Sequence, residues 1–355
     1  MSNEQISGPA KEPEKSFYQR WLDSEGIPVL RDFTVPDVRT VPLSRWERKG
    51  GSGVYLNLVG TEEVDDAYLC EIPPGEALHP QRHLFEEMIF ILSGRGVTTV
   101  WQEGSPKQEF RWQSGTLFSP PLNSWHQHRN VDPKEPARYL AVTNAPVFLN
   151  LFHNSDFVFQ NPAVFPERFS GEPDYFDRPA EFAGGRLWRA NVVPDVHTYE
   201  LIRWERRGAS FGSAHFELSG NVMVSHIAEL PPGIYAKGHR HGGGAHVTIL
   251  SGKGYTLMWQ EGKPKQRFDW QEGSLIVPPE GWFHQHFNTG KGPMRHLAMR
   301  WGGSKGYIGR KYKPDTNIRE GGDQINYEDE DPEIRRMFEE ELKKEGVPSA
   351  MPAVS

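Results

Sequence analysis

The sequence predicts an all-β protein built from two tandem barrels with short peripheral helices. Three observations lead to this prediction: an internal repeat, short runs of branched and aromatic residues separated by turn residues, and a high content of glycine and proline. The 355 residues include 36 glycines and 29 prolines, and 12% of the residues are aromatic. Such a composition favours short strands and tight turns over helical bundles. The length allows roughly two domains of about 150 residues each.

The repeat consists of short segments that recur 158 positions later in the chain. The matching pairs are Val-Pro-Asp-Val at 35–38 and 193–196, Arg-Trp-Glu-Arg at 45–48 and 203–206, Pro-Pro-Gly at 73–75 and 231–233, Trp-Gln-Glu-Gly at 101–104 and 259–262, and His-Gln-His at 126–128 and 284–286. Because a fixed period marks duplicated structural units, we expect two homologous barrels. Within the first copy, 89–92 and 97–101 are expected strands around a turn at 93–96.

The repeat divides the chain into five expected segments. They are an N-terminal arm at 1–34, a first barrel at 35–150, a connector at 151–192, a second barrel at 193–301 and an acidic tail at 302–355. The connector is rich in phenylalanine and proline, so we expect it to pack against the barrels.

The acidic tail predicts one helix, which either lies on the surface or contacts another subunit. Asp331 suits the N-cap, Pro332 suits the first helical position and Gly346 suits the end. The apolar stripe of this helix consists of Ile334, Phe338 and Leu342.

Composition excludes several classes of protein. The single cysteine, Cys70, cannot form an internal disulfide or a cysteine zinc cluster, which favours a reducing compartment. The longest strongly apolar run, 88–92, is far shorter than the roughly 18 residues of a membrane span. The N-terminus lacks the pattern of a signal peptide, so we expect a cytoplasmic protein. Most of the net charge of −7 comes from residues 319–345, and the rest of the chain has no basic excess, which argues against nucleic-acid binding.

Histidines in the second copy indicate a metal site. His239 and His241 lie two residues apart on a segment expected to be extended, so their side chains should point to one face. His284 follows a turn rich in proline and glycine about forty residues later. Three neutral imidazoles that converge inside a barrel can hold a divalent first-row metal and leave positions open for a reactant.

These residues resemble the two sequence motifs of the cupin superfamily. The second copy matches the first motif at Gly233, His239, His241 and Gly252, and the second motif at Gly273, Pro279, Gly281, His284 and Asn288. Ala245 stands where the motif has glutamate, and the neighbouring His246 is a possible fourth ligand.

The first copy resembles the same motifs less completely. Gln81 replaces the first histidine, while His83, Glu87 and His126 match. These four residues form a second, weaker candidate metal site, and the alternative is a purely structural barrel.

The resemblance implies a bicupin, a class that includes gentisate 1,2-dioxygenases, oxalate decarboxylases and quercetinases. Oxalate decarboxylases use three histidines and one glutamate with manganese, whereas the all-histidine set here resembles that of gentisate, diketone and thiol dioxygenases. The resemblance therefore implies Fe(II), with Mn, Ni or Zn as alternatives. It also implies a homodimer or homotetramer.

Three neutral ligands leave the 2+ charge of a metal uncompensated, which favours an anionic chelating substrate. Our hypothesis is an Fe(II)-dependent dioxygenase that cleaves a small anionic aromatic or enolic substrate. One alternative is a metal-dependent isomerase, lyase or decarboxylase that does not use O2. The other is a non-catalytic bicupin that binds a ligand.

Further residues are predicted to complete the site. His286 should face the same interior as His284 and is a candidate catalytic acid or base or an anion anchor, although a purely structural hydrogen bond would explain it as well. Tyr255, Met258 and Trp259 are candidates for the substrate pocket, with core packing as the alternative. The three glycines at 242–244 either bulge to admit substrate or form a plain turn.

Overall fold

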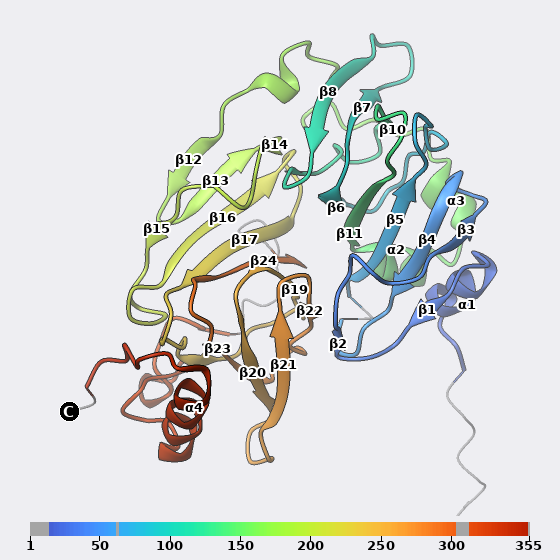
Figure 1. Ribbon diagram of the computed structural model, residues 1–355. Coiled ribbons are helices and arrows are strands. Elements are labelled where there is room, and N and C mark those ends of the chain that lie inside the picture. The colour runs from blue at the N-terminus through green and yellow to red at the C-terminus, as the bar shows by residue number, and fades with distance from the viewer. Residues whose placement is uncertain (1–13, 62–63, 303–311, 354–355) are drawn as a thin grey trace, which may run out of the picture.

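The computed structural model describes residues 14–61, 64–302 and 312–353 (Figure 1). The chain folds almost entirely into strands, and these form two barrels of two sheets each, which confirms the predicted fold class. Among the described residues, no helix combines the length and the apolar character needed to cross a membrane.

The N-terminal barrel combines an eight-stranded and a three-stranded sheet. The larger sheet has the order β1-β4-β5-β11-β6-β9-β14, with β3 paired to β4, and the smaller has the order β10-β7-β8. The strands of these sheets are β1 (Val29–Leu30), β3 (Ser44–Trp46), β4 (Gly51–Leu56), β5 (Asp66–Ile72), β6 (Glu87–Ser93), β7 (Arg95–Trp101), β8 (Gln108–Gln113), β9 (Leu117–Phe118), β10 (Trp125–Asn130), β11 (Ala137–Thr143) and β14 (Val192–Val193).

The C-terminal barrel repeats this plan with a nine-stranded and a five-stranded sheet. The larger has the order β12-β13-β16-β17-β24-β19-β22-β2, with β15 paired to β16, and the smaller has the order β21-β20-β23-β18-β25. The strands are β2 (Thr34–Val35), β12 (Glu181–Gly184), β13 (Leu187–Ala190), β15 (Ile202–Arg203), β16 (Gly212–Leu218), β17 (Met223–Leu230), β18 (Gly238–His239), β19 (His246–Ser251), β20 (Lys253–Trp259), β21 (Gln266–Gln271), β22 (Leu275–Ile276), β23 (Phe283–Asn288), β24 (Met294–Trp301) and β25 (Gln324–Ile325).

The two large sheets share one apolar core between the barrels. Along β11, Tyr139 and Ala141 face the interior of their own barrel, whereas Leu140 and Val142 join the shared core. Leu297 of β24 joins the shared core from the opposite barrel. This alternation follows from the period of two along a strand.

The first strand of each repeat pairs with the opposite barrel. In the N-terminal arm, β2 pairs with β22, and in the connector β14 pairs with β9. The backbone N–H of Val38 donates to the carbonyl of Gly273, and that of Val196 donates to the carbonyl of Gly115, both at 2.9 Å. The predicted barrel boundaries remain a prediction, and the structure adds that the segments at their N-terminal ends are exchanged.

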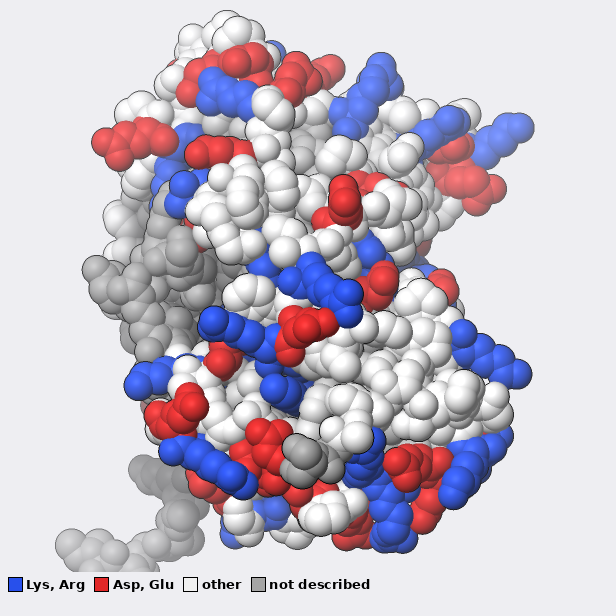
Figure 2. Space-filling model, turned by 90° about the vertical axis from the view of Figure 1, so that its left-hand side faces the viewer, with Lys and Arg blue, Asp and Glu red and all other residues white. Residues whose placement is uncertain are grey.

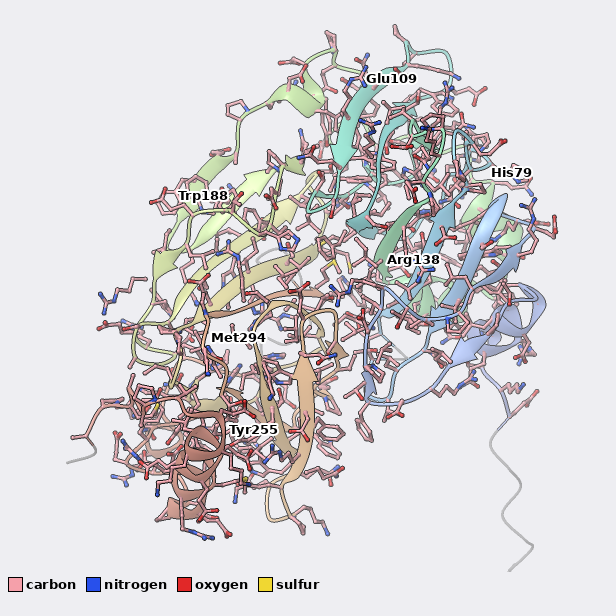
Figure 3. The ribbon with its side chains drawn as sticks, in the orientation of Figure 1. His79, Glu109, Arg138, Trp188, Tyr255 and Met294 are labelled. Atoms are coloured by element: carbon pink, nitrogen blue, oxygen red, sulfur yellow. The ribbon has the colours of Figure 1, made fainter. Side chains whose placement is uncertain are left out.

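Two equivalent arginines anchor the segments that follow these strands. Arg138, labelled in Figure 3, donates to the carbonyl of Arg39 at 2.7 Å and pairs with Glu71 at 2.9 Å. Arg295 donates to the carbonyl of Val196 at 2.9 Å and pairs with Glu229 at 3.1 Å. The exchange is therefore held by side chains as well as by strand pairing.

Helices lie at the periphery. They are α1 (Phe17–Ser24), α2 (Ala145–Phe152), α3 (Ser155–Phe159) and α4 (Pro332–Glu345), with 3-10 turns at Tyr175–Asp177 and Ile318–Glu320. The predicted helix of the tail is α4: Asp331 caps it by accepting from the N–H of Glu333, and its three predicted apolar residues are buried. It covers the outer face of the five-stranded sheet next to Tyr235 and Phe287.

The connector packs against the barrels over part of its length. Phe169 and Tyr175 are buried in the core of the N-terminal barrel, whereas Phe157 and Phe182 remain largely exposed. On the face shown in Figure 2, acidic and basic side chains are interspersed.

Candidate metal centre

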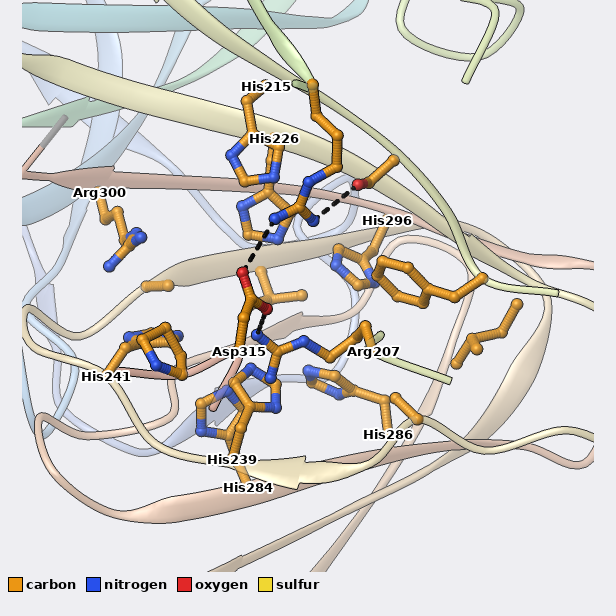
Figure 4. A pocket seen from close by; sticks show the side chains of 18 residues that line it. Arg207, His215, His226, His239, His241, His284, His286, His296, Arg300 and Asp315 are labelled. Carbon is orange, nitrogen blue, oxygen red and sulfur yellow. Dashed lines mark hydrogen bonds and ion pairs between the residues drawn. The ribbon is translucent and has the colours of Figure 1, made fainter. Parts of the chain in front are cut away.

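The three histidines predicted as ligands converge in the C-terminal barrel (Figure 4). His239 of β18 lies directly opposite His284 of β23 in the antiparallel pairing. One ring nitrogen from each of His239, His241 and His284 lies within 4.8 Å of the others. The ring centroids of His239 and His284 are 4.2 Å apart, and those of His241 and His284 are 4.8 Å apart.

The hydrogen bonds of these rings suit metal coordination. Nδ1 of His239 lies 3.2 Å from the carbonyl of Lys237, and Nδ1 of His284 lies 3.3 Å from that of Trp282. An Nδ1–H that donates to a carbonyl leaves the lone pair of Nε2 free for a metal. Nδ1 of His241 is buried without a hydrogen-bond partner. Burial lowers the pKa of all three imidazoles, which keeps them in the neutral form that binds metals.

A cavity of about 220 Å³ adjoins the three histidines. Four more histidines line it: His215 of β16, His226 of β17, His286 of β23 and His296 of β24. Arginines and one carboxylate complete its charged lining, namely Arg186, Arg207, Arg300 and Asp315. The cavity is large enough for a small molecule beside a metal ion.

Three of these four histidines, His215, His226 and His296, were not predicted from the sequence. His215 and His226 are directly paired across β16 and β17, and His296 follows on β24 with its ring centroid 5.6 Å from that of His226. The detectable signal was the presence of histidine at 215 and 226 in the second copy, where the repeat places Asn57 and Tyr68 in the first copy.

His286 lies in the cavity wall as predicted, within a short hydrogen-bonded chain. The Trp270 indole N–H donates to Thr256 Oγ1 at 3.0 Å, and this oxygen lies 2.7 Å from His286 Nδ1. The Thr256 hydroxyl can thus donate to Nδ1, which leaves the proton of the neutral ring on Nε2. Burial lowers the pKa of His286 to about 4. His128 makes the equivalent bond to Thr98 in the other barrel, at 2.8 Å, which fits a structural part for this chain.

Other predicted residues lie apart from the cavity. Nε2 of His246 lies 3.4 Å from Thr61 Oγ1 of the N-terminal barrel, in the interface between the barrels. Tyr255 and Trp259 belong to the cluster beneath α4, and Met258 belongs to the core of the barrel. Figure 3 shows Tyr255 on the side near α4. In the described part of the chain, none of these four residues lines the cavity.

The three glycines at 242–244 form part of the contact between the barrels. A β-carbon on Gly244 would lie 2.2 Å from the Thr61 methyl group and 2.8 Å from the carbonyl oxygen of Gly60. The close approach therefore requires glycine at this position. The carbonyl of Gly242 accepts from Arg300 at 3.0 Å, so the turn also positions a cavity residue.

A second convergent group lies in the N-terminal barrel. Nε2 of His83 and Nε2 of His126 lie 3.7 and 3.6 Å from the Glu87 carboxylate. Their Nδ1 atoms lie 2.7 and 3.0 Å from the carbonyls of Phe85 and Ser124, which directs both Nε2 lone pairs toward the carboxylate. Gln81 Nε2 lies 3.2 Å from His126 Nε2. Two histidines and one carboxylate form a set that suits a divalent metal.

This N-terminal group contains its own cation and little free space. Lys49 Nζ lies 2.6 Å from the Tyr68 hydroxyl and 3.8 Å from the Glu87 carboxylate, to which Tyr68 also donates. The adjoining cavity measures about 10 Å³, room for about one water molecule at most, because aromatic side chains such as Tyr18 and Trp21 of α1 fill the barrel mouth. This group could hold an ion but has no room for a substrate.

Comparisons with known proteins agree with this architecture. A family model described as cupin domain matches residues 68–143. Structures of Bacillus subtilis oxalate decarboxylase superpose on both barrels: one mutant has a TM-score of 0.51 at 18% identity and covers 77% of this chain and 78% of its own. The chain has the bicupin fold.

Two further structures of that bicupin give the same result. The oxalate decarboxylase at pH 4.6 has a TM-score of 0.51 at 17% identity and covers 77% of each chain. A structure whose title concerns the Mn(II) centres of the Bacillus subtilis enzyme has a TM-score of 0.50 at 17% identity, covering 77% of this chain and 78% of its own. No curated protein matches the sequence.

Proposed function

We propose that this bicupin is a metal-dependent enzyme that acts on a small anionic substrate in its C-terminal barrel. The observation that carries the proposal is the convergence of His239, His241 and His284 beside a cavity with three arginines. The N-terminal group lacks such a cavity, so its part is to hold the barrel together, with or without an ion.

The residues of the cavity have separable parts in this proposal. His239, His241 and His284 would hold the ion, which when bound supplies Lewis acidity and sites for a chelating substrate and a second reactant. Arg207 and Arg300 attract the anion and orient it. His286 presents an Nε2–H that donates a hydrogen bond to bound substrate.

Within this function we infer an Fe(II)-dependent dioxygenase. The support is the donor set: the structure has Ala245, buried, at the position equivalent to Glu87, and His246 points to the other barrel. With three neutral ligands the ion keeps its full charge for an anionic substrate.

A metal-dependent decarboxylase is the second candidate. Its support is the likeness to oxalate decarboxylase structures, one of whose titles names Mn(II). The cavity chemistry suits both reactions, because each begins with a small anion bound beside a metal.

Oxygen consumption separates the two candidates. Protein reconstituted with Fe(II) or with Mn(II) is supplied with gentisate, salicylate, catechols, diketones and oxalate in an oxygen electrode, with parallel detection of CO2. Oxygen uptake in proportion to substrate, lost in His239→Ala, is the expected result. Turnover that continues without oxygen would favour the decarboxylase. Binding without turnover of any compound would favour a non-catalytic bicupin.

A further inference from the structure

The cavity next to the three histidines contains more positive than negative charge. Its one carboxylate, Asp315, lies between two guanidinium groups (Figure 4). Its oxygens lie 2.6 Å from Arg207 Nη2 and 3.3 Å from Arg186 Nη2. A carboxylate held between two guanidinium groups is a strong, directional arrangement. The protein therefore already contains a carboxylate site at this position.

Among the residues that the structure describes, no further carboxylate in the cavity compensates the remaining positive charge. Arg300 donates from Nη1 to the carbonyl of Gly242, and its Nε is buried without a partner; Arg207 Nη1 is also buried without one. Within the described part of the chain, no carboxylate forms an ion pair with Arg300. Asp65 lies nearby, but burial raises the pKa of its carboxyl, which favours the neutral form.

The histidines of the cavity do not alter this balance. Burial lowers the pKa of His215, His226 and His296, so they are neutral at ordinary pH. Three guanidinium groups thus share one carboxylate, and a metal ion would add further positive charge. Buried charge without compensation is costly, and an anionic ligand would relieve the cost.

The equivalent positions of the first barrel do not form such a site. The repeat places Lys49 at the position of Arg207. The Lys49 ammonium already donates a hydrogen bond to the Tyr68 hydroxyl and forms an ion pair with Glu87. In the sheet, Arg300 pairs with Val224 and the equivalent Thr143 pairs with Asp66, so the position of Arg300 holds a neutral residue in the first barrel. The excess of arginines is therefore specific to the barrel that has the larger cavity.

We propose that the substrate carries two anionic groups: one binds at the three-histidine centre, and a second, a carboxylate, replaces Asp315 between Arg186 and Arg207. The first half rests on the proposed function, whereas the second rests only on the arginines. The Asp315 side chain is 32% exposed and can leave the two arginines without disturbing the core. The substrate class is a small dicarboxylate or a carboxylated phenol or enol.

Binding measurements on the full chain test this proposal. The probes are salicylate, with one carboxylate, and 4-hydroxyisophthalate, which is salicylate with a second carboxylate. Calorimetric titration is carried out on metal-free and on Zn(II)-loaded protein, because zinc does not support redox turnover. The variants are Asp315→Asn, Arg207→Lys and, as a control, Arg203→Met, whose arginine lies on β15 with a side chain that is 70% exposed.

We expect 4-hydroxyisophthalate to bind about tenfold more tightly than salicylate. Asp315→Asn should strengthen binding of 4-hydroxyisophthalate about tenfold in both metal states and change salicylate binding by less than threefold. Arg207→Lys should remove most of the preference for 4-hydroxyisophthalate over salicylate, and Arg203→Met should leave this preference unchanged. Because Asp315→Asn keeps the shape of the side chain, this variant should fold. Its result therefore tests the proposal even if the Arg207→Lys protein does not fold.

Two results would overturn the proposal. One is equal affinity for the two probes in the parent protein and in Asp315→Asn. The other is loss of zinc from Asp315→Asn, which would make Asp315 a metal ligand. Failure of the proposed function gives a different pattern: no metal bound by the parent protein, with the preference for 4-hydroxyisophthalate retained in the metal-free protein.

Discussion

Replacing Lys49 with methionine should destabilise the metal-free protein strongly. Lys49 and Glu87 are 4% and 2% exposed, and the Lys49 ammonium lies 3.8 Å from the Glu87 carboxylate. Removing one partner of a buried ion pair costs about 3–5 kcal/mol, because the other charge stays buried and unpaired. The ammonium also lies 5.2 Å from the Trp46 ring centroid and 4.3 Å from the Tyr68 ring centroid, and methionine removes these cation–π contacts with the charge while it keeps a similar apolar volume. The loss should therefore come from charge and not from a cavity.

A divalent ion should restore much of this loss. An ion held by His83, Glu87 and His126 would supply the missing positive charge, and a ligand present at 100 times its Kd stabilises the folded state by about 2.7 kcal/mol. Calorimetric unfolding of Lys49→Met with EDTA and with Zn(II) measures both effects. The double variant Lys49→Met/Glu87→Gln is the matched control, since it removes both charges and should recover stability without metal.

Either of two results would show that Lys49 and Glu87 do not form a stabilising buried ion pair. One is a Lys49→Met protein that unfolds within about 1 kcal/mol of the parent in EDTA, well below the cost expected for an unpaired buried charge. The other is additivity, in which Lys49→Met and Glu87→Gln together cost the sum of the two single changes. Additivity would mean that the two charges do not interact.

Three further predictions concern the C-terminal barrel. By elemental analysis, His239→Ala should contain one metal ion per chain fewer than the parent protein, whereas His246→Ala should keep the parent's metal content. Equal metal contents in the two variants would contradict the assignment of His239 as a ligand. Burial, with neighbouring histidines and Arg300, holds the pKa of His226 well below 6.5. Below about pH 6 the unfolded state therefore binds more protons than the folded state, and the free energy of unfolding decreases as the pH is lowered. His226→Gln should remove up to about 1.4 kcal/mol per pH unit of that fall in urea unfolding at pH 7 to 5, and an unchanged slope would argue against a buried neutral imidazole. Thr256→Val should lower the free energy of unfolding by about 1–3 kcal/mol in the same assay, because it leaves His286 Nδ1 and the Trp270 indole N–H buried and unpaired. An unchanged free energy of unfolding would show that these hydrogen bonds contribute little to stability.

Much of the fold was predictable because its signals are local. The turn residues and the cap at Asp331 each act within a few residues, and the repeat is read by matching short segments, so the barrels and α4 could be derived from short segments. The three-histidine centre was predictable for the same reason. His239 and His241 share a face of one extended segment, and His284 follows a turn that a glycine and a proline mark.

The rest of the site depends on packing between distant elements. Arg186 and Asp315 are 129 positions apart and meet only because the connector and the segment after β24 reach the same barrel mouth. The closure of the first barrel likewise depends on Tyr18 and Trp21, which lie in an arm outside the repeat. Residue spacing in a single sequence does not predict contacts between side chains so far apart in the chain. Of the pocket residues predicted from β20, Tyr255 and Trp259 do not reach the cavity because the pleat directs them to the outer face, whereas Met258 packs in the core of the barrel.

The reciprocal pairing of β2 with β22 and of β14 with β9 ties the two halves into an interlocked whole. A half expressed alone would lack one edge strand and would leave its own first strand without a sheet to join. Melting should accordingly proceed as a single cooperative event. Such reciprocity is also what gene fusion of two strand-swapped subunits would leave behind, with a covalent connector in place of the ancestral dimer contact.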